Sequence, residues 1–446
     1  MTSYAARRAA LMAHMQAKGG GIAIIPTAPE VKRNSDSDYP YRHDSYFYYL
    51  SGFGEPEAVI VLVAGKTTQS LLFCREKNME REIWDGFRYG PDAACSMFGF
   101  DMAFPITALD IELPRLIART PALFYAFGQH AALNAQVQNW LAAVRLQART
   151  GASAPSALHD VQALLDEMRL FKDAGEIAIM RRAAAISAGA HARAMRHSRP
   201  GLHEYQVEAE LLHEFRRHGS DSPAYTSIVA AGANACVLHY RAGNTVLKDG
   251  DLVLIDAGCE LDGYASDITR TYPANGVFTG PQRALYEIVL AAQAAAIAEA
   301  VPGRSIADGH DAAVRVLAQG MLDTGLLDGN KAGTLDDIIA KGEYRPFYMH
   351  RTGHWIGMDV HDVGGYRESG RAAEGADKPW RILQPGMALT VEPGLYVRPA
   401  PGVPEQYWNI GIRIEDDVVI TENGCDVLSC DAPKDVTEIE ALMRSK

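Results

Sequence analysis

The sequence contains few cysteines and no long apolar run. Its six cysteines are scattered over 446 residues without a C-x-x-C pair, which excludes the dense disulfide framework of a small secreted protein and favours a reducing compartment. No segment approaches the roughly 18 apolar residues of a membrane-spanning helix. Polar residues interrupt the apolar stretch after Arg7 and Arg8, which argues against a signal peptide. A cytoplasmic protein is therefore expected.

An excess of basic residues is also lacking. Lysine and arginine number 43 against 55 aspartates and glutamates, giving a formal net charge of −12. This charge argues against nucleic acid and acidic membranes as partners, because both need a positive surface. The 48% hydrophobic and 22% charged residues are ordinary for a globular protein, and the length suggests two or three domains.

Two domains follow from the hydrophobic pattern. Residues 1–155 alternate short apolar runs with helical stretches, which indicates an α/β domain, and they end in a Gly-, Ser- and Pro-rich break. A linker helix is expected over residues 156–172. Residues 173–446 begin with a D-x-x-E capping box at Asp173 and Glu176. Their later mixture of Gly-rich turns, strands and helices indicates an α+β domain.

The predicted elements alternate along both domains. Strands are predicted over residues 22–25, 46–50, 58–63, 70–74, 122–127, 252–255, 388–392 and 410–420. Helices are predicted over residues 3–17, 78–88, 130–147, 159–171, 173–195, 203–218, 281–300 and 307–325. The strand at 252–255 is apolar at every position, so we expect it to be buried on both faces.

Two aspartates flank a predicted β-hairpin. Asp262-Gly263 is a strong signal for a two-residue turn, and folding about it places Asp256 opposite Thr269. Side chains alternate along a strand, so Asp267 shares a face with Thr269 and with Asp256. The carboxylates become diagonal neighbours roughly 7–8 Å apart at the backbone, able to reach two metal ions about 3.5–4 Å apart. Alternatively, Asp256 caps a turn and Asp267 faces solvent.

Three histidines fall in one short segment. His350, His354 and His361 lie in YMHRTGHWIGMDVHD. A helix would place the first two on one face, but Gly353 and Gly357 disfavour a helix. We therefore expect irregular backbone near a site, with one histidine as a metal ligand and the others beside it or catalytic. The alternative is a group of surface histidines.

Two more carboxylates belong to apolar strands. Glu392 closes the strand MALTVE before a Pro-Gly turn. Residues 410–415 alternate strictly, so the isoleucines face a core while Arg413 and Glu415 share a polar face. Arg413 can then hold a ligating carboxylate in place. As solvent-facing side chains, these two residues would need no further explanation.

These residues form a candidate site for two divalent cations. Asp256, Asp267, Glu392 and Glu415 with one neutral imidazole carry a formal charge of about −4, which two such ions neutralise. Oxygen-rich ligation with one nitrogen suits manganese, magnesium or cobalt better than structural zinc. None of the cysteines is spaced to join the site.

The motifs resemble those of a known enzyme family. D-A-G…S-D-I-T-R-T, H-x-x-x-H, L-T-V-E-P-G and R-I-E-D-D occur in this order, as in the pita-bread metallopeptidases. Within that group the chain most resembles the bacterial aminopeptidase P (Xaa-Pro aminopeptidase) family. The resemblance covers nearly the whole length and includes S-G-F-G-E-P-E-A-V, R-E-I-W-D-G and V-P-E-Q-Y. It implies a creatinase-like α/β N-terminal domain and a pita-bread catalytic domain.

The resemblance implies two metal ions, with manganese expected, that share ligands. Asp267 and Glu415 would bridge both ions. Asp256 would complete the first metal site, and His354 with Glu392 would complete the second. A hydroxide bridging the ions would attack the carbonyl before proline, with Glu392 as proton shuttle. The substrate's free amino group would contact the metal site, which limits cleavage to the first bond.

The resemblance also implies the other catalytic and substrate-binding residues. His239, His350 and His361 would surround the substrate, and His361 together with a metal would stabilise the oxyanion. Arg413 would support the metal ligands. Trp84 would reach the active site of a neighbouring subunit and, like His350, contact substrate. A homo-oligomer, a tetramer or a dimer, is therefore expected.

The implied activity is release of the N-terminal residue from peptides with proline in the second position. The chain reads H-R-T-G-H where bacterial members often read H-G-L-S-H, and the stretch between His361 and Gln384 is long, with a G-G-Y reminiscent of prolidase. Both departures bear on the preferred peptide length. One alternative is therefore a prolidase, which cleaves only Xaa-Pro dipeptides. The other alternative is a catalytically inactive pita-bread protein that binds ligands.

Overall fold

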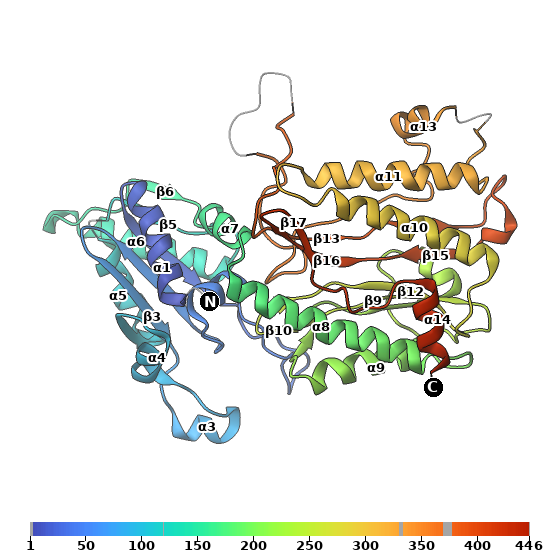
Figure 1. Ribbon diagram of the computed structural model, residues 1–446. Coiled ribbons are helices and arrows are strands. Elements are labelled where there is room, and N and C mark those ends of the chain that lie inside the picture. The colour runs from blue at the N-terminus through green and yellow to red at the C-terminus, as the bar shows by residue number, and fades with distance from the viewer. Residues whose placement is uncertain (1–2, 119, 330–332, 369–376, 446) are drawn as a thin grey trace. The chain divides into compact units, whose positions relative to one another are not determined.

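The chain folds into two compact units. They comprise Met1–Arg169 and Leu170–Lys446, and Figure 1 colours them by residue number. The predicted domain limits at residues 155 and 173 fall on either side of this division. The computed structural model describes residues 3–118, 120–329, 333–368 and 377–445.

The first unit is built on one six-stranded sheet. Its strands are β1 (Gly21–Pro26), β2 (Val59–Ala64), β3 (Thr68–Cys74), β4 (Met102–Pro105), β5 (Ala122–Phe124) and β6 (Ala157–His159). Their order is β4-β3-β2-β1-β5-β6. The two pairs β1-β2 and β2-β3 are antiparallel, and the three pairs β3-β4, β1-β5 and β5-β6 are parallel. The mixed sheet with its helices confirms the predicted α/β class.

Helices separate most of the strands of this sheet along the chain. They are α1 (Tyr4–Ala17), α2 (Ser45–Ser51), α3 (Met79–Asp85), α4 (Gly90–Phe98), α5 (Leu109–Ile117), α6 (Ala131–Leu146) and α7 (Gln162–Leu170). The predicted helices over 3–17, 78–88 and 130–147 are confirmed. Helices α4 and α5 occupy a stretch for which no element was predicted.

One predicted strand is wrong. The aromatic run at residues 46–50 predicts a strand, but the chain forms α2 there. The Asp44 side chain caps this helix by accepting a hydrogen bond from the Phe47 backbone N–H, and Gly52 ends it in the left-handed region at φ 66°. Phe47 and Leu50 are buried. Capping and packing therefore outweigh the strand preference of aromatic side chains.

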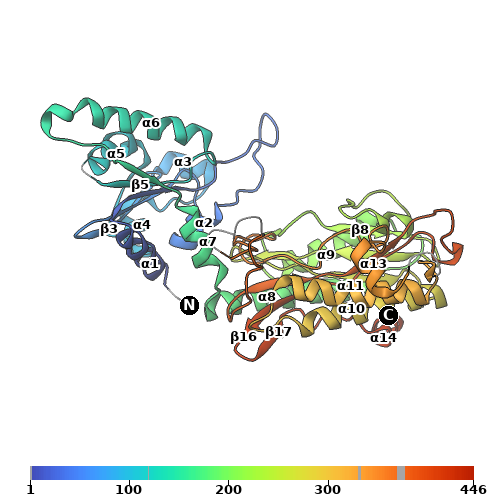
Figure 2. The same cartoon turned by 90° about the horizontal axis from the view of Figure 1, so that it is seen from above.

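The second unit places its strands between two pairs of helices. Its helices are α8 (Ala174–His197), α9 (Glu204–Arg217), α10 (Gly280–Ala298), α11 (Ile306–Asp323), α13 (Leu335–Lys341) and α14 (Val436–Arg444). In Figure 1, α8 and α9 lie on one side of the strands and α10 and α11 on the other. Figure 2 shows α10 and α11 side by side, and the two helices are in contact. This layering confirms the predicted α+β class.

Four small sheets form the middle layer of this unit. Its strands are β7 (Ser222–Pro223), β8 (Ile228–Ala231), β9 (Leu252–Asp256), β10 (Cys259–Leu261), β11 (Tyr264–Ala265), β12 (Thr269–Pro273), β13 (Ala388–Val391), β14 (Gly394–Val397), β15 (Ile410–Arg413), β16 (Asp416–Thr421) and β17 (Gly424–Val427). The sheets are ordered β11-β10-β7, β12-β9-β8, β13-β16-β17 and β14-β15. The central strand β9 is buried along its whole length, as predicted.

Residues 410–420 form two strands rather than the single predicted one. Strand β15 pairs with β14, whereas β16 pairs with β13 and β17 in a different sheet. Between them, the Glu415 backbone N–H donates to the Thr269 carbonyl oxygen at 3.1 Å. The chain changes sheets at this position because a neighbouring strand satisfies its backbone there. Glu415 is consequently placed at the junction of two sheets.

Two sequence expectations concern disulfide bonds and membrane-spanning helices. All six cysteines are free thiols. Among the residues that the structure describes, no helix has the length and apolar character needed to cross a membrane. The predicted D-x-x-E box is confirmed at the start of α8, where Asp173 and Glu176 cap each other's backbone N–H groups.

Candidate metal centre and active site

The predicted hairpin forms with the predicted register. Asp262 (φ 51°) and Gly263 (φ 81°) both adopt left-handed backbone, as a two-residue turn of type I′ requires. Asp256, the last residue of β9, pairs with Thr269, the first residue of β12. Asp267 precedes Thr269 by two residues. The turn therefore sets the separation of the two aspartates along the ladder.

Tyr225 joins the two aspartates. Its hydroxyl lies 2.6 Å from Asp256 Oδ1 and 2.5 Å from Asp267 Oδ1 and donates to this pair. The aspartates are only 9% and 5% exposed. Their side chains thus point to one place, as the hairpin geometry predicts.

His354 adds a nitrogen to this carboxylate cluster. Its Nδ1 lies 3.0 Å from the Trp355 carbonyl oxygen, which directs Nε2 toward the cluster, 3.5 Å from Asp267 Oδ2 and 3.9 Å from Glu392 Oε1. Donor atoms of Asp267, His354 and Glu415 all lie within 4.8 Å of one another. The backbone of residues 349–365 is irregular, as the glycines predict.

Arg413 contacts the cluster from the polar side of β15. Its Nη2 donates to Asp256 Oδ2 at 2.5 Å, its Nε donates to Thr269 Oγ1 at 3.1 Å, and its Nη1 donates to the Tyr396 hydroxyl at 3.0 Å. The Thr269 hydroxyl in turn donates to Glu415 Oε2 at 2.7 Å. Arg413 thus orients the Asp256 carboxylate directly, and it orients the Glu415 carboxylate through the Thr269 hydroxyl.

The cluster holds more negative charge than its protein surroundings balance. Burial and repulsion by neighbouring carboxylates raise the pKa of Glu415 well above its ordinary value. Burial raises the pKa of Glu392 to about 7. Burial alone would lower the pKa of His354, but attraction by Asp267 and Glu392 raises it to about 9. The site therefore strongly favours the binding of positive charge.

This donor set fits divalent cations. Buried carboxylate oxygens with one imidazole are the ligands of manganese, magnesium and similar ions, and the imidazole is oriented through its other ring nitrogen, as in metal sites. The residues that could hold such ions are Asp256, Asp267, His354, Glu392 and Glu415.

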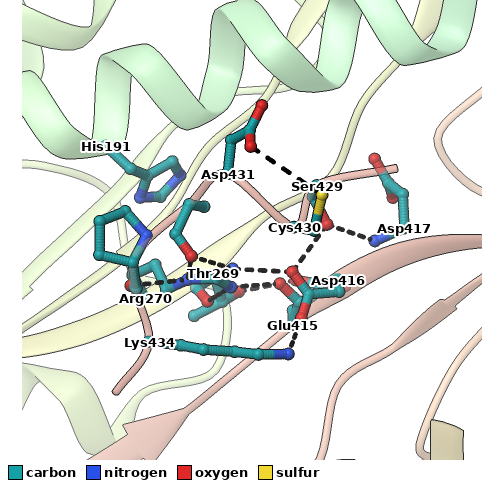
Figure 3. Close-up of polar contacts among 12 residues, drawn as sticks. His191, Thr269, Arg270, Glu415, Asp416, Asp417, Ser429, Cys430, Asp431 and Lys434 are labelled. Carbon is teal, nitrogen blue, oxygen red and sulfur yellow. Dashed lines mark hydrogen bonds and ion pairs between the residues drawn. The ribbon is translucent and has the colours of Figure 1, made fainter. Parts of the chain in front are cut away.

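A buried ion-pair network lies behind Glu415 (Figure 3). Arg270 donates from Nη1 to the Glu415 carbonyl oxygen at 2.6 Å and from Nη2 to Asp416 Oδ1 at 2.7 Å. Both side chains of this ion pair are fully buried. Lys434 Nζ contacts the other oxygen of Asp416 at 2.6 Å. The network ties β12 to the start of β16 and so fixes the backbone at Glu415.

The other predicted histidines line one cavity with the cluster. The cavity has a volume of about 860 Å³, and His239, His350 and His361 are part of its wall. The His361 ring stacks on His354 with centroids 3.9 Å apart. His350 Nε2 lies 2.9 Å from the Tyr396 hydroxyl. The cavity thus presents imidazole rings beside the carboxylates.

Trp84 is the one predicted site residue outside the second unit. It belongs to α3 in the first unit and is 83% exposed. Met79, Ile83 and Phe87 on and beside the same short helix are 73%, 82% and 64% exposed. Helix α3 therefore presents an apolar surface.

Three residues of the site were not predicted to belong to it. Thr269 could have been found, because the hairpin register places it opposite Asp256 and its hydroxyl on the same face. Tyr225 precedes β8, and Tyr396 lies within β14. No motif or spacing singles out either tyrosine, since each reaches the cluster through pairing that only the tertiary fold establishes.

Comparisons with known proteins identify the family of each unit. The model of "Metallopeptidase family M24" matches residues 178–422, and that of "Aminopeptidase P, N-terminal domain" matches residues 4–125. The Xaa-Pro aminopeptidase of Escherichia coli K12 is 47% identical over 98% of this chain and 96% of its own length. The structure of Pseudomonas aeruginosa aminopeptidase PepP superposes with a TM-score of 0.94 and 51% identity, covering 100% of this chain and 99% of that one.

The second unit thus has the fold of a metallopeptidase. The chain belongs to metallopeptidase family M24, and its first unit is the N-terminal domain of the aminopeptidase P group. An Escherichia coli aminopeptidase P variant in complex with substrate also superposes with a TM-score of 0.94 at 46% identity, covering 99% of this chain and 98% of that one. The predicted creatinase-like and pita-bread domains are confirmed by these matches.

Proposed function

We propose that this chain is an Xaa-Pro aminopeptidase, which releases the N-terminal residue from peptides with proline in the second position. The observation that carries the proposal is the convergence of four carboxylates and His354 in the wall of one cavity. The names of the similar proteins support the substrate class, and a solved relative binds the inhibitor Pro-Leu.

We propose two metal ions, with manganese as the metal. Asp267 contacts Tyr225 beside Asp256 on one side and His354 on the other, a position that suits a shared ligand. Glu415 completes a close group with Asp267 and His354. Two divalent ions would balance the charge of about −4 carried by the four carboxylates. A relative in this group has been prepared in zinc-substituted form, so metal analysis must include zinc.

The proposed reaction is hydrolysis of the first peptide bond. Divalent ions, when bound, supply Lewis-acid polarisation of the scissile carbonyl and acidify a water. Glu392, whose pKa lies at about 7, can accept a proton from the attacking water and pass it to the leaving proline nitrogen. His361 lines the cavity beside His354 and can donate a hydrogen bond to the developing oxyanion. His239 and His350 would position the peptide, and Arg413 would keep Asp256 oriented.

We propose further that copies of this chain associate through α3. The exposed Trp84, Ile83 and Met79 support this, because such a surface is typical of an interface. Trp84 would then contact substrate bound in a neighbouring subunit. The expected cytoplasmic location stays a prediction.

Hydrolysis of three peptides tests the proposed function. Enzyme treated with a chelator is supplied with Ala-Pro, Ala-Pro-Ala or Ala-Ala-Ala, with and without added Mn²⁺. Manganese-dependent release of alanine from Ala-Pro-Ala but not from Ala-Ala-Ala supports a proline-specific aminopeptidase. Cleavage of Ala-Pro alone identifies a prolidase. If none of the peptides is cleaved with any metal, the chain is a binding protein without catalytic activity.

A further inference from the structure

In the cavity wall, the negative charges lie at the proposed metal ligands, and the other charged side chains are positive. Every carboxylate that lines the cavity in the described part of the chain belongs to the proposed metal ligands. The other charged lining residues are Arg413, which is paired with Asp256, and Arg241, Arg351 and Arg367. Two divalent ions would neutralise the carboxylates, so the remaining cavity wall carries a positive charge.

Trp380 holds two of these arginines in place. The Arg367 guanidinium carbon lies 3.6 Å from the centroid of the Trp380 ring, and that of Arg351 lies 5.5 Å from it. Arg367 also donates to the Lys378 carbonyl oxygen at 2.8 Å. A guanidinium that stacks by its face keeps its N–H edge available for an anion. The pair is therefore oriented without a bound carboxylate.

The backbone next to Arg351 is fixed as well. The Arg351 carbonyl oxygen lies 2.7 Å from His350 Nδ1, and the following residue, Thr352, is held by the Tyr348 hydroxyl at 2.6 Å. None of the described carboxylates forms an ion pair with Arg351 or Arg367 within 4.0 Å. Among the described residues, neither of these two guanidinium groups forms an ion pair with a carboxylate; Asp311 attracts Arg351 electrostatically without forming one.

The separation from the metal ligands suits a short peptide. Arg351 precedes His354 by three residues, so their Cα atoms lie at most about 11 Å apart. An extended peptide covers that distance in roughly three residues. On the proposed function, the substrate's amino group lies at the metal ligands and its later residues extend along the cavity. A carboxylate on the third or fourth residue then comes within reach of the arginines.

We propose that Arg351 and Arg367, organised by Trp380, form a carboxylate-binding subsite for the part of the substrate that follows proline. This inference rests on the proposed function and narrows its substrate class to peptides with an anionic group near the third residue. The group is either the C-terminal carboxylate of a tripeptide or tetrapeptide or the side chain of an aspartate or glutamate. Both offer the planar pair of oxygens that a guanidinium binds through two hydrogen bonds.

Four peptides separate these sources. Ala-Pro-Ala carries a C-terminal carboxylate, Ala-Pro-Ala-amide carries none, Ala-Pro-Glu-amide carries a side-chain carboxylate, and Ala-Pro-Gln-amide is its neutral counterpart. For the wild-type enzyme with Mn²⁺, we expect kcat/KM to be about tenfold higher for at least one carboxylate peptide than for its neutral counterpart, as for one charge-assisted contact. The peptide pair that shows the difference identifies the source. Equal kcat/KM within both pairs overturns the inference.

Variants then assign the preference to the two arginines. In Arg351→Gln and Arg367→Gln, kcat/KM for the preferred carboxylate peptide should fall about five- to tenfold while the neutral counterpart changes less than about twofold. Arg351→Lys should retain part of the preference, because it keeps the charge but loses the two-point contact. Arg315→Gln, on α11 and outside the cavity wall, is the matched control and should leave all four values unchanged.

The outcomes distinguish this inference from the proposed function. Equal losses for carboxylate and neutral peptides in the two variants overturn the subsite, because a general loss shows a structural role. Cleavage of the amide peptides at the wild-type rate in every variant, without any carboxylate preference, removes the subsite and leaves the aminopeptidase intact. If no Xaa-Pro peptide of any kind is cleaved, the proposed function itself fails.

Discussion

Burial raises the pKa of Glu392 to about 7, so this carboxyl can both accept and release a proton near neutral pH. We expect Glu392→Gln to lower kcat for Ala-Pro-Ala by at least about 100-fold, because an amide cannot relay the proton. Glu422→Gln is the matched control, since Glu422 is exposed just beyond β16. Steady-state kinetics at saturating Mn²⁺ make the comparison. Near-normal kcat in Glu392→Gln would contradict the proposed proton transfer.

A second residue-scale consequence concerns pH and stability. His191, labelled in Figure 3, is fully buried on α8, and burial lowers its pKa to about 4. The unfolded chain binds this proton below about pH 6.5 and the folded chain only below about pH 4, so stability falls as the pH drops through this window. We expect about 2 kcal/mol of loss from His191 between pH 7 and pH 5.

Thermal unfolding at pH 7 and pH 5 checks this expectation. His191→Gln should show a smaller drop in melting temperature between the two pH values than wild type. His213→Gln, at an exposed position of α9, should show the wild-type drop. An equal drop in all three proteins would mean that other groups control the acid sensitivity.

Residue identity alone did not reveal the whole site. The proposed ligands stand out in the sequence because charged side chains at the ends of apolar strands need a partner. Tyr225 and Tyr396 do not stand out, because a tyrosine in an apolar context is ordinary core material and its hydroxyl partner depends on tertiary packing. The arginines at 351 and 367 are equally ordinary in sequence, and only the position of Trp380 reveals their pairing.

At the scale of elements, the sequence predicts structure well where a local motif allows only one geometry. The turn at Asp262-Gly263 fixes the register, and the pairing of Asp256 with Thr269 follows from counting residues. The strand predicted at residues 46–50 is wrong because helix caps at its ends decide its conformation. The division of residues 410–420 into two strands was not predicted, because periodicity does not report which sheet a strand joins.

The link between β12 and β16 leads to a stability prediction. We expect Arg270→Met to lower the free energy of unfolding by about 3 kcal/mol or more, since it leaves the fully buried Asp416 short of a counter-charge. Lys434→Met should cost about 1 kcal/mol or less, because Lys434 is 30% exposed and Arg270 remains. The double variant Arg270→Met/Asp416→Leu should recover part of the loss. Denaturant unfolding measures all three, and equal costs for the two single variants would contradict the assignment.

At the scale of the whole molecule, metal binding and stability are linked. Ions that bind only the folded second unit add about 2.7 kcal/mol for each site at 100 times the dissociation constant. We therefore expect Mn²⁺ to raise the melting temperature of chelator-treated protein by several degrees. Glu415→Gln replaces a carboxyl whose raised pKa favours the neutral form. This variant should keep the metal-free melting temperature and lose most of the gain; a full gain would exclude Glu415 as a ligand.

Association through α3 is testable on the same scale. We expect Trp84→Ser to shift the mass measured by light scattering toward a smaller species and to lower kcat/KM for Ala-Pro-Ala. Leu146→Ser is the matched control, because Leu146 is 86% exposed at the end of α6. A monomeric wild-type protein, or equal effects of both substitutions, would contradict an interface at α3.

The spacing of the ligands along the chain has a consequence for biosynthesis. Asp256 and its partner Arg413 are separated by 157 positions, and Glu415 follows two residues later. At a synthesis rate of about 5–20 residues per second, the first aspartates emerge from the ribosome roughly 10–30 s before Glu415, the last of the proposed ligands. A nascent chain therefore carries unpaired acidic residues destined for the interior until Arg413 and Glu415 have been made. On the proposed function, metal loading then follows the synthesis of residues 413–415.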